Sequence, residues 1–143
     1  MTDSTQTSRR RGFIVGPGEG ESLPGAGGRL LADTVRTDGR LSVIESVMPP
    51  GDRTPLHVHA EMDEAFYVLE GEYTITCGPD TFTATPGCFV YLPSGIPHAL
   101  RAGRQGGRKL IFGQPAGLED FFGELATAED LVALGSRHGI TFL

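Results

Sequence analysis

Two histidines separated by a single residue constrain this chain more than any other feature. His57 and His59 lie in the stretch of residues 51–71, and Glu64 follows after a turn, at the start of an apolar strand. Side chains alternate between the two faces of an extended strand, so both imidazoles should project from one face. Two imidazoles with a carboxylate close behind can bind a divalent transition metal and leave coordination positions open. This stretch therefore predicts a metal site.

A second segment supplies a further ligand from a distant part of the chain. Residues 87–97 read as an apolar strand followed by a Pro-Ser-Gly turn, and His98 comes directly after them. Three of the four histidines fall in these two segments, which favours a shared site over histidines scattered on a surface strand. Nitrogen and oxygen ligands do not separate Fe, Ni, Mn, Co and Zn. We expect one such ion, held by His57, His59, Glu64 and His98.

The first segment resembles the first motif of the cupin family. That motif consists of Gly, five residues, His-x-His, three or four residues, Glu, six residues and Gly. The matching residues are Gly51, His57, His59, Glu64 and Gly71.

The second segment resembles the second cupin motif except at its end. Gly87, Pro93, Gly95 and His98 match it, but three residues past His98 stands Arg101 rather than the family's Asn. Because the Asn is not a metal ligand in the family, the departure concerns hydrogen bonding after the motif and not the predicted metal ligands.

The cupin resemblance implies an all-β fold, the double-stranded β-helix or jelly-roll barrel. The many short strands separated by Gly- and Pro-containing turns independently predict a sandwich or barrel. Within the family the chain looks most like small single-domain bacterial cupins of the quercetin-dioxygenase type. In those proteins the motif glutamate is both ligand and base, so the resemblance gives Glu64 a catalytic role as well.

Three regions are expected along the chain: a disordered polar tail over residues 1–11, a cupin barrel over 12–115 and a helical extension over 116–143. Leu118, Phe121, Phe122 and Leu125 recur at the spacing of an amphipathic helix. Thr127 can cap a second helix, with Asp130 at the capping-box position. The apolar extension should pack on the outside of the barrel or on a second subunit, and we expect a homodimer.

The segment before the metal motif should contain a short strand at residues 13–15 and a flexible glycine-rich loop at 16–28. This loop lacks the register of a phosphate-binding loop and could instead act as a lid. Strands at 29–36 and 41–48 should form a hairpin around Asp38-Gly39.

Composition limits the partners and the location. A net charge of -6 argues against nucleic acid as the main partner. No run of 18 apolar residues is present, and the N-terminus lacks an apolar signal region, so we expect no membrane association and a cytoplasmic protein. Cys77 and Cys88 lie in apolar strands and are expected to be reduced, buried thiols.

An apolar pocket should surround the metal and bind a small-molecule substrate. Phe66, Phe82, Tyr91 and Phe112 are its candidate substrate contacts, and the Tyr91 hydroxyl is also a candidate proton donor. Arg53 and Arg101 could hold a substrate carboxylate or form surface ion pairs. His138 should be an exposed histidine at the end of a helix.

Three functions remain open from the sequence. The resemblance favours a dioxygenase that acts on an enol, catechol or polyketide-like small molecule. The same metal could instead polarise a carbonyl for non-redox isomerisation, cyclisation or decarboxylation. The barrel could also be a non-catalytic binding module, because one fold hosts many functions.

Overall fold

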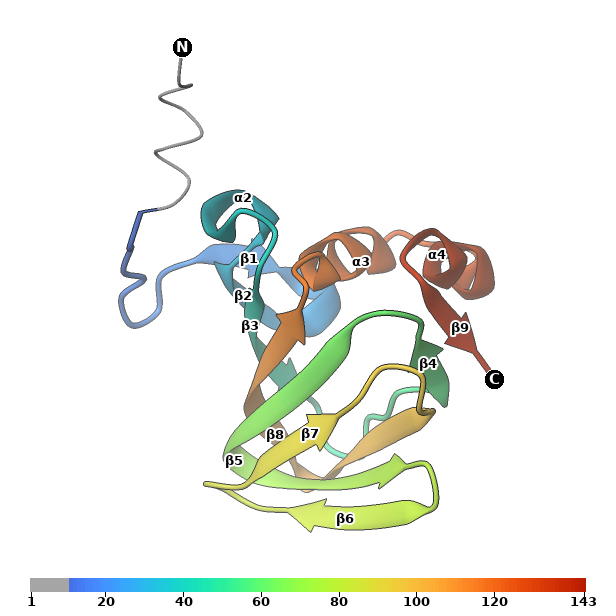
Figure 1. Ribbon diagram of the computed structural model, residues 1–143. Coiled ribbons are helices and arrows are strands. Elements are labelled where there is room, and N and C mark those ends of the chain that lie inside the picture. Colours follow the sequence, from blue (N-terminus) through green and yellow to red (C-terminus); the bar gives the residue numbers. More distant parts are fainter. Residues whose placement is uncertain (1–10) are drawn as a thin grey trace.

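Two long strands, β5 (Asp63–Cys77) and β8 (His98–Gln114), organise the fold (Figure 1). They pair antiparallel from end to end, with register shifts between Val68 and Glu70 and between Gly71 and Tyr73. Such irregularities bend a strand. Gly71 has a positive φ of 75°, and a Cβ there would collide with the carbonyl of Gly106, so a glycine suits this crossing.

The strands of residues 11–143, the part of the chain that the computed structural model describes, form one continuous nine-stranded sheet that bends over at β5 and β8 into two layers. One layer contains the second half of β8 and the first half of β5 together with β7 (Phe89–Leu92), β3 (Ser42–Met48), β2 (Gly28–Ala32) and β1 (Glu21–Leu23).

The other layer contains the first half of β8 and the second half of β5. They are flanked by β6 (Asp80–Ala84), β4 (His57–His59) and β9 (Ile140–Phe142). Phe66 and Val68 from one layer share a single buried cluster with Tyr73 and Ile75 from the other. This antiparallel double-layered sheet confirms the predicted all-β, jelly-roll class.

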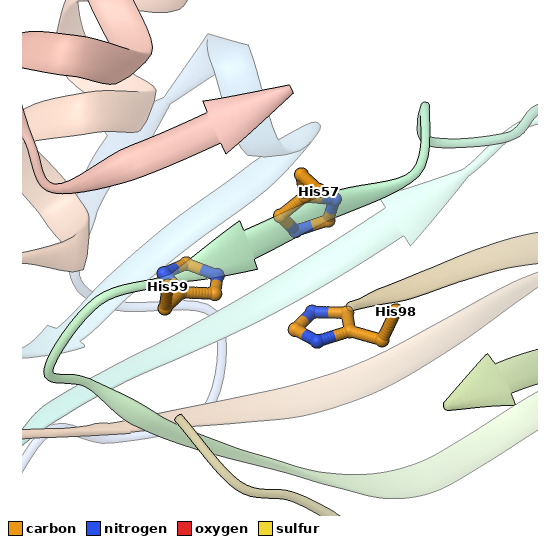
Figure 2. Close-up of side chains that lie close together, drawn as sticks. All are labelled: His57, His59 and His98. Atoms are coloured by element: carbon orange, nitrogen blue, oxygen red, sulfur yellow. The ribbon is translucent and has the colours of Figure 1, made fainter. Parts of the chain in front are cut away.

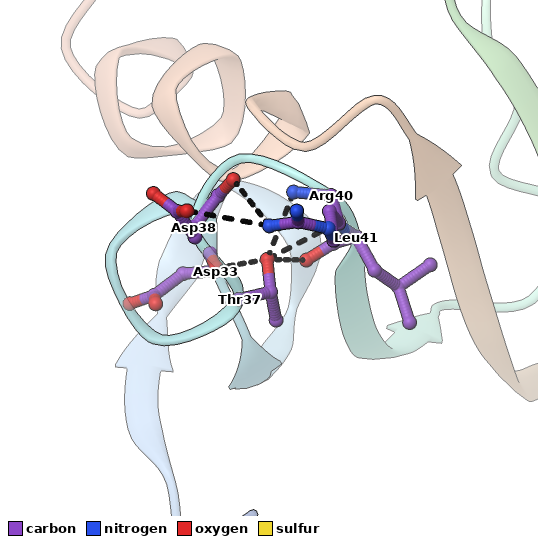
Figure 3. A network of polar contacts seen from close by, with 5 residues as sticks. All are labelled: Asp33, Thr37, Asp38, Arg40 and Leu41. Carbon is purple, nitrogen blue, oxygen red and sulfur yellow. Dashed lines mark hydrogen bonds and ion pairs between the residues drawn. The ribbon is translucent and has the colours of Figure 1, made fainter. Parts of the chain in front are cut away.

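The connection between β2 and β3 contains a helical turn, α2 (Thr34–Thr37), that the sequence analysis missed (Figure 3). The Asp33 carboxylate accepts a hydrogen bond from the Arg36 amide at 2.8 Å and caps the turn. Thr37 Oγ1 accepts from the Leu41 amide at 3.1 Å and joins the turn to the segment before β3. The predicted hairpin pairing is confirmed, but β2 ends at Ala32 because Asp33 starts the helical turn.

The N-terminal part differs from the prediction in two ways. Residues 13–15 are not a strand, and the Phe13 ring instead lies 4.0 Å from the guanidinium carbon of Arg36. The expected glycine-rich loop contains β1 and the 3₁₀ helix η1 (Pro24–Ala26). Ser46 Oγ donates to the Ala26 carbonyl at 2.9 Å and fixes η1 against β3. All but the last residue of the predicted tail lies outside the described residues.

Two helices and a strand end the chain. α3 (Leu118–Leu125) confirms the predicted amphipathic helix. α4 (Leu131–Arg137) begins after Asp130, whose carboxylate accepts from the Ala133 amide at 3.1 Å. The predicted Thr127 cap was therefore wrong, because Asp130 itself is the N-cap. The following residues form β9, which pairs with β4 and so joins the strand that carries two of the predicted ligands.

Candidate metal centre and cavity

Three histidines from two strands converge at one point of the fold (Figure 2). His57 and His59 project from β4, and His98 begins β8 as the direct register partner of His57. The ring centroids of His57 and His98 are 4.4 Å apart, and those of His59 and His98 are 5.4 Å apart. One nitrogen of each ring lies within 4.8 Å of the others, a spacing at which one ion can bind all three.

Glu64 completes the group from the inward face of β5. Its Oε2 lies 3.3 Å from His59 Nε2, and its Oε1 lies 3.8 Å from His98 Nε2. Burial opposes ionisation of this carboxyl group, but the neighbouring imidazoles of His59 and His98 outweigh burial and hold the pKa of Glu64 below its ordinary value. The structure thus brings together all four residues that the motif spacing selects.

The imidazole rings are in the neutral state that can coordinate a metal ion. The Nδ1–H of His57 donates to the Pro55 carbonyl at 2.8 Å, which leaves Nε2 as the free lone-pair nitrogen. Burial lowers the pKa of His57, and it lowers the pKa of His98 to about 4, so both rings are neutral near pH 7.

Buried ring nitrogens without hydrogen-bond partners give the clearest test of whether a metal ion fits this cluster. Within residues 11–143, His59 Nε2 and both ring nitrogens of His98 are buried and have no hydrogen-bond partner. Buried polar atoms are nearly always paired, and a coordinated metal ion would satisfy the lone pairs facing the cluster. The donor set of neutral imidazoles and one carboxylate therefore fits a divalent transition metal.

A cavity of about 640 Å³ opens beside this cluster. His57, His59 and Glu64 line it, whereas His98 is only 1% exposed and is not part of the lining. Most of its wall is apolar, and the helices and the last strand close part of it. The apolar lining residues include Met48, Phe66, Leu100, Ile111, Phe121 and Phe142.

Only one of the four predicted substrate contacts lines the cavity, namely Phe66. Tyr91 alternates with the buried residues of β7 and is 53% exposed. Phe82 is 41% exposed on β6, and Phe112 follows the inward Ile111. The expectation that these three contact substrate needs correction, and so does the assignment of Tyr91 as a proton donor, because their strand positions place them outside the cavity lining.

Two features of the cavity escaped the sequence analysis. Lys109 is only 2% exposed and lines the cavity beside Ile111. Alternation along β8 could have revealed it, because Lys109 shares the inward parity of Ile111. The second feature is the C-terminal segment, which contributes Phe121 and Phe142 to the wall instead of packing only on the outside. Arg53 also lines the cavity, whereas Arg101, its isolated β-bridge partner, does not.

Comparisons with known proteins agree with this geometry. The cupin domain family model matches residues 44–108, which include all four candidate ligands. Quercetin 2,3-dioxygenase of Bacillus subtilis is 33% identical over 91 residues, covering 62% of this chain and 27% of that protein. The alginate biosynthesis protein AlgA of Pseudomonas aeruginosa is 31% identical over 114 residues, covering 73% of this chain and 24% of that protein. The chain thus spans about a quarter of the length of these two relatives.

Solved structures show the same fold. Ectoine synthase from P. lautus is 25% identical, has a TM-score of 0.60, and the match covers 81% of this chain and 74% of that one. An RmlC-like cupin from Shewanella frigidimarina is 22% identical with a TM-score of 0.57, and the match covers 65% of this chain and 78% of that one. No helix among residues 11–143 is long and apolar enough to cross a membrane. The chain is a small cupin that resembles quercetin-dioxygenase-like proteins.

Proposed function

We propose that this protein is a metal-dependent cupin enzyme, and that a dioxygenase acting on an enol, catechol or polyketide-like small molecule is its foremost candidate activity. The observation that carries the proposal is the convergence of His57, His59, His98 and Glu64 beside a cavity, with buried ring nitrogens left unpartnered. The 33% identity to quercetin 2,3-dioxygenase, over a region that covers 62% of this chain, supports dioxygenase chemistry as the first candidate.

Each element of the site has a role in this proposal. A bound Fe, Ni, Mn, Co or Zn ion would act as a Lewis acid that lowers the pKa of an enol or catechol hydroxyl. The lowered pKa of Glu64 keeps its carboxylate ionised, so one of its oxygens can accept the hydroxyl proton. Phe66 and Ile111 provide apolar surface for the substrate body and exclude water from it.

A non-redox reaction on the same site is the second candidate. The similarity to ectoine synthase covers 81% of this chain, more than the 62% covered by the dioxygenase. That protein is named as a synthase and not as an oxygenase, which supports keeping a non-redox isomerase, cyclase or decarboxylase as the alternative. A non-catalytic small-ligand-binding cupin is the third.

Dioxygen uptake separates the candidates. Protein purified without chelator is assayed for transition metal and then for oxygen consumption with a panel of flavonols and catechols. A His57→Ala, His98→Ala double variant is the control. We expect about one metal ion per chain and metal-dependent uptake, both lost in the variant.

Each other result has a definite meaning. Turnover that proceeds equally under anaerobic conditions would replace the dioxygenase with the non-redox candidate. Ligand binding without turnover would favour the binding module. Protein that contains no metal and takes none up on titration would overturn the metalloenzyme proposal.

The size of the substrate, the lack of a nucleic-acid partner, the cellular location and the oligomeric state are also proposals. A small-molecule substrate fits a cavity of about 640 Å³. The net charge of -6 supports the absence of a nucleic-acid partner, and the free thiols of Cys77 and Cys88 support a cytoplasmic location. Exposed aromatic side chains on β5 and β7 support a homodimer.

A further inference from the structure

Lys109 places a buried positive charge in the cavity without a close negative partner. Its Nζ lies 3.5 Å from Met48 Sδ, 4.6 Å from the Tyr73 ring centroid and 5.2 Å from that of Phe66. No carboxylate oxygen of residues 11–143 forms an ion pair with it within 4.0 Å. A buried ammonium group without a paired anion is costly, which makes this residue a candidate for ligand binding.

The amine keeps its charge at neutral pH. Burial lowers the pKa of Lys109 to about 8, and the more distant carboxylates of Glu64 and Asp52 oppose the decrease. A pKa of about 8 leaves most of the amine protonated at pH 7. The aromatic rings of Phe66 and Tyr73 offer it cation–π contacts but cannot neutralise it.

The position of Lys109 relative to the histidine cluster defines the shape of a ligand. Glu64 pairs with Gly113 across the sheet, and Lys109 lies four residues before Gly113 on the same strand. This offset is about 13 Å at the usual strand rise of about 3.3 Å per residue. Ile111 lies between the two positions, and with Phe66 and Leu100 it gives the cavity an apolar wall.

We infer that the substrate is a small organic acid whose carboxylate pairs with Lys109 while an oxygen at its other end reaches the histidine cluster. The apolar body between the two groups lies against Phe66 and Ile111. Lys109 thereby selects carboxylates over neutral molecules of the same shape. The inference rests on the proposed function for the oxygen-binding end, whereas the carboxylate end can be tested without turnover.

Among the described residues, Arg53 is the second Lys or Arg side chain of the cavity lining, and it provides a matched control. Unlike Lys109, it is exposed to water. A hydrated guanidinium group gains little from an exposed ion pair, while a buried ammonium group recovers a large desolvation cost when an anion pairs with it. Removal of Lys109 should therefore abolish acid selectivity, and removal of Arg53 should not.

The test compares 3,4-dihydroxycinnamate with its primary amide. Both carry the same catechol and apolar body, but only the first has a carboxylate. Binding to the metal-containing protein is measured by calorimetry under anaerobic conditions, which prevents oxidative turnover. We expect the acid to bind at least about 10-fold more tightly than the amide. The ratio should fall to near one in Lys109→Met and Lys109→Gln and stay unchanged in Arg53→Met.

The controls make every outcome decisive. Two substitutions at Lys109 are made in case one of them prevents folding. Each variant must keep the wild-type metal content and a cooperative thermal transition. Equal binding of acid and amide to the wild type, failure of the acid to bind, or selectivity that survives in a folded Lys109 variant would overturn the inference. Loss of selectivity in Arg53→Met would assign carboxylate binding to the exposed Arg53. That result would also overturn the inference. Acid selectivity without later dioxygen uptake would contradict the dioxygenase but leave the role of Lys109 standing.

Discussion

The carboxylate of Glu64 lies 3.3 Å from Nε2 of His59, and both side chains are almost completely buried. They belong to different strands, β5 and β4, and the chain turns between them. Neighbouring carboxylates at Glu61 and Asp63 do not share this position: Glu61 is exposed, and Asp63 Oδ1 accepts a hydrogen bond from the Ser94 amide at 2.8 Å. Among residues 11–143, Glu64 is therefore the carboxylate that can reach an ion held by the histidines.

Glu64→Gln should weaken metal binding while Glu61→Gln should not. The amide keeps the shape of the side chain but loses the negative charge and one strong oxygen donor. Because outer-shell substitutions at metal sites already cost about 10- to 100-fold in affinity, we expect a loss of at least about 10-fold for this ligand. Competition with a chromogenic chelator measures the affinity. Equal affinities for the two variants would remove Glu64 from the ligand set.

The candidate ligands could be predicted because their spacing is local. His57, His59 and Glu64 are fixed relative to one another by one short strand, one turn and the parity of the next strand. His98 is different, because nothing local shows that it pairs with His57 across the sheet. The strand, turn and histidine of residues 87–98 suggested it as a further ligand, and the resemblance to a two-motif family supported its place in the same site.

The cavity wall was less predictable because it depends on long-range packing. An apolar aromatic residue in a strand can face the core or the solvent, and Tyr91 and Phe112 were selected by residue type rather than by parity. Lys109 was overlooked because a lysine is normally exposed. The short ending Ile140–Phe142 gave no sign that it would pair with β4, since strand pairing across the whole chain leaves no local signal.

A buried carboxylate holds α3 against the barrel and should make stability depend on pH. Glu119 accepts hydrogen bonds from Ser42 Oγ at 2.5 Å, from the Thr34 amide at 2.9 Å and from Thr34 Oγ1 at 2.8 Å. Burial favours the neutral acid, but these bonds lower the pKa of Glu119 below its ordinary value. We expect Ser42→Ala to reduce the free energy of unfolding by about 1–3 kcal/mol at pH 7.

The sign of the pH effect follows from the lowered pKa. The ionised Glu119 stabilises the folded state fully above the ordinary carboxyl pKa of 4.5, and this contribution is lost as the pH falls through the lower folded-state value. Denaturant titrations should show the wild type and Glu119→Gln converging below about pH 4.5. Ser22→Ala, at an exposed site on β1, is the control and should change little. A wild-type advantage that persists unchanged in acid would rule out this ionisation as its source.

Two helical glycines should respond in opposite directions to alanine. At Gly123, in α3, a Cβ would meet nothing within 4 Å, so alanine should raise the free energy of unfolding by about 0.5–1 kcal/mol. At Gly135, in α4, a Cβ would lie 2.7 Å from both the Ile140 carbonyl oxygen and Phe142 Cε2. There the overpacking should outweigh helix propensity and destabilise the protein by about 1–3 kcal/mol. Thermal and denaturant unfolding measure both; stabilisation by Gly135→Ala would show that β9 does not pack tightly on α4.

The outer face of β5 and β7 carries an aromatic surface that suits a second copy of the chain. Tyr67 and Phe89 are direct cross-strand partners, and Tyr91 follows two residues later on β7. Their exposed fractions are 40%, 63% and 53%. Exposed apolar groups clustered in this way favour association. We expect a homodimer of twice the 15.2 kDa chain mass, with Phe89→Lys raising its dissociation constant by about 10-fold or more.

Light scattering coupled to size-exclusion chromatography over a dilution series measures this change. Val132→Lys is the matched control, because Val132 is 66% exposed on α4, away from the strands that carry the aromatic surface. A lysine in the aromatic surface would have to be desolvated on association, whereas one on α4 would stay in water. Dissociation by Phe89→Lys alone assigns the interface to β5 and β7. A wild-type monomer at all concentrations would contradict the dimer, and dissociation by Val132→Lys alone would place the contact on the C-terminal helices.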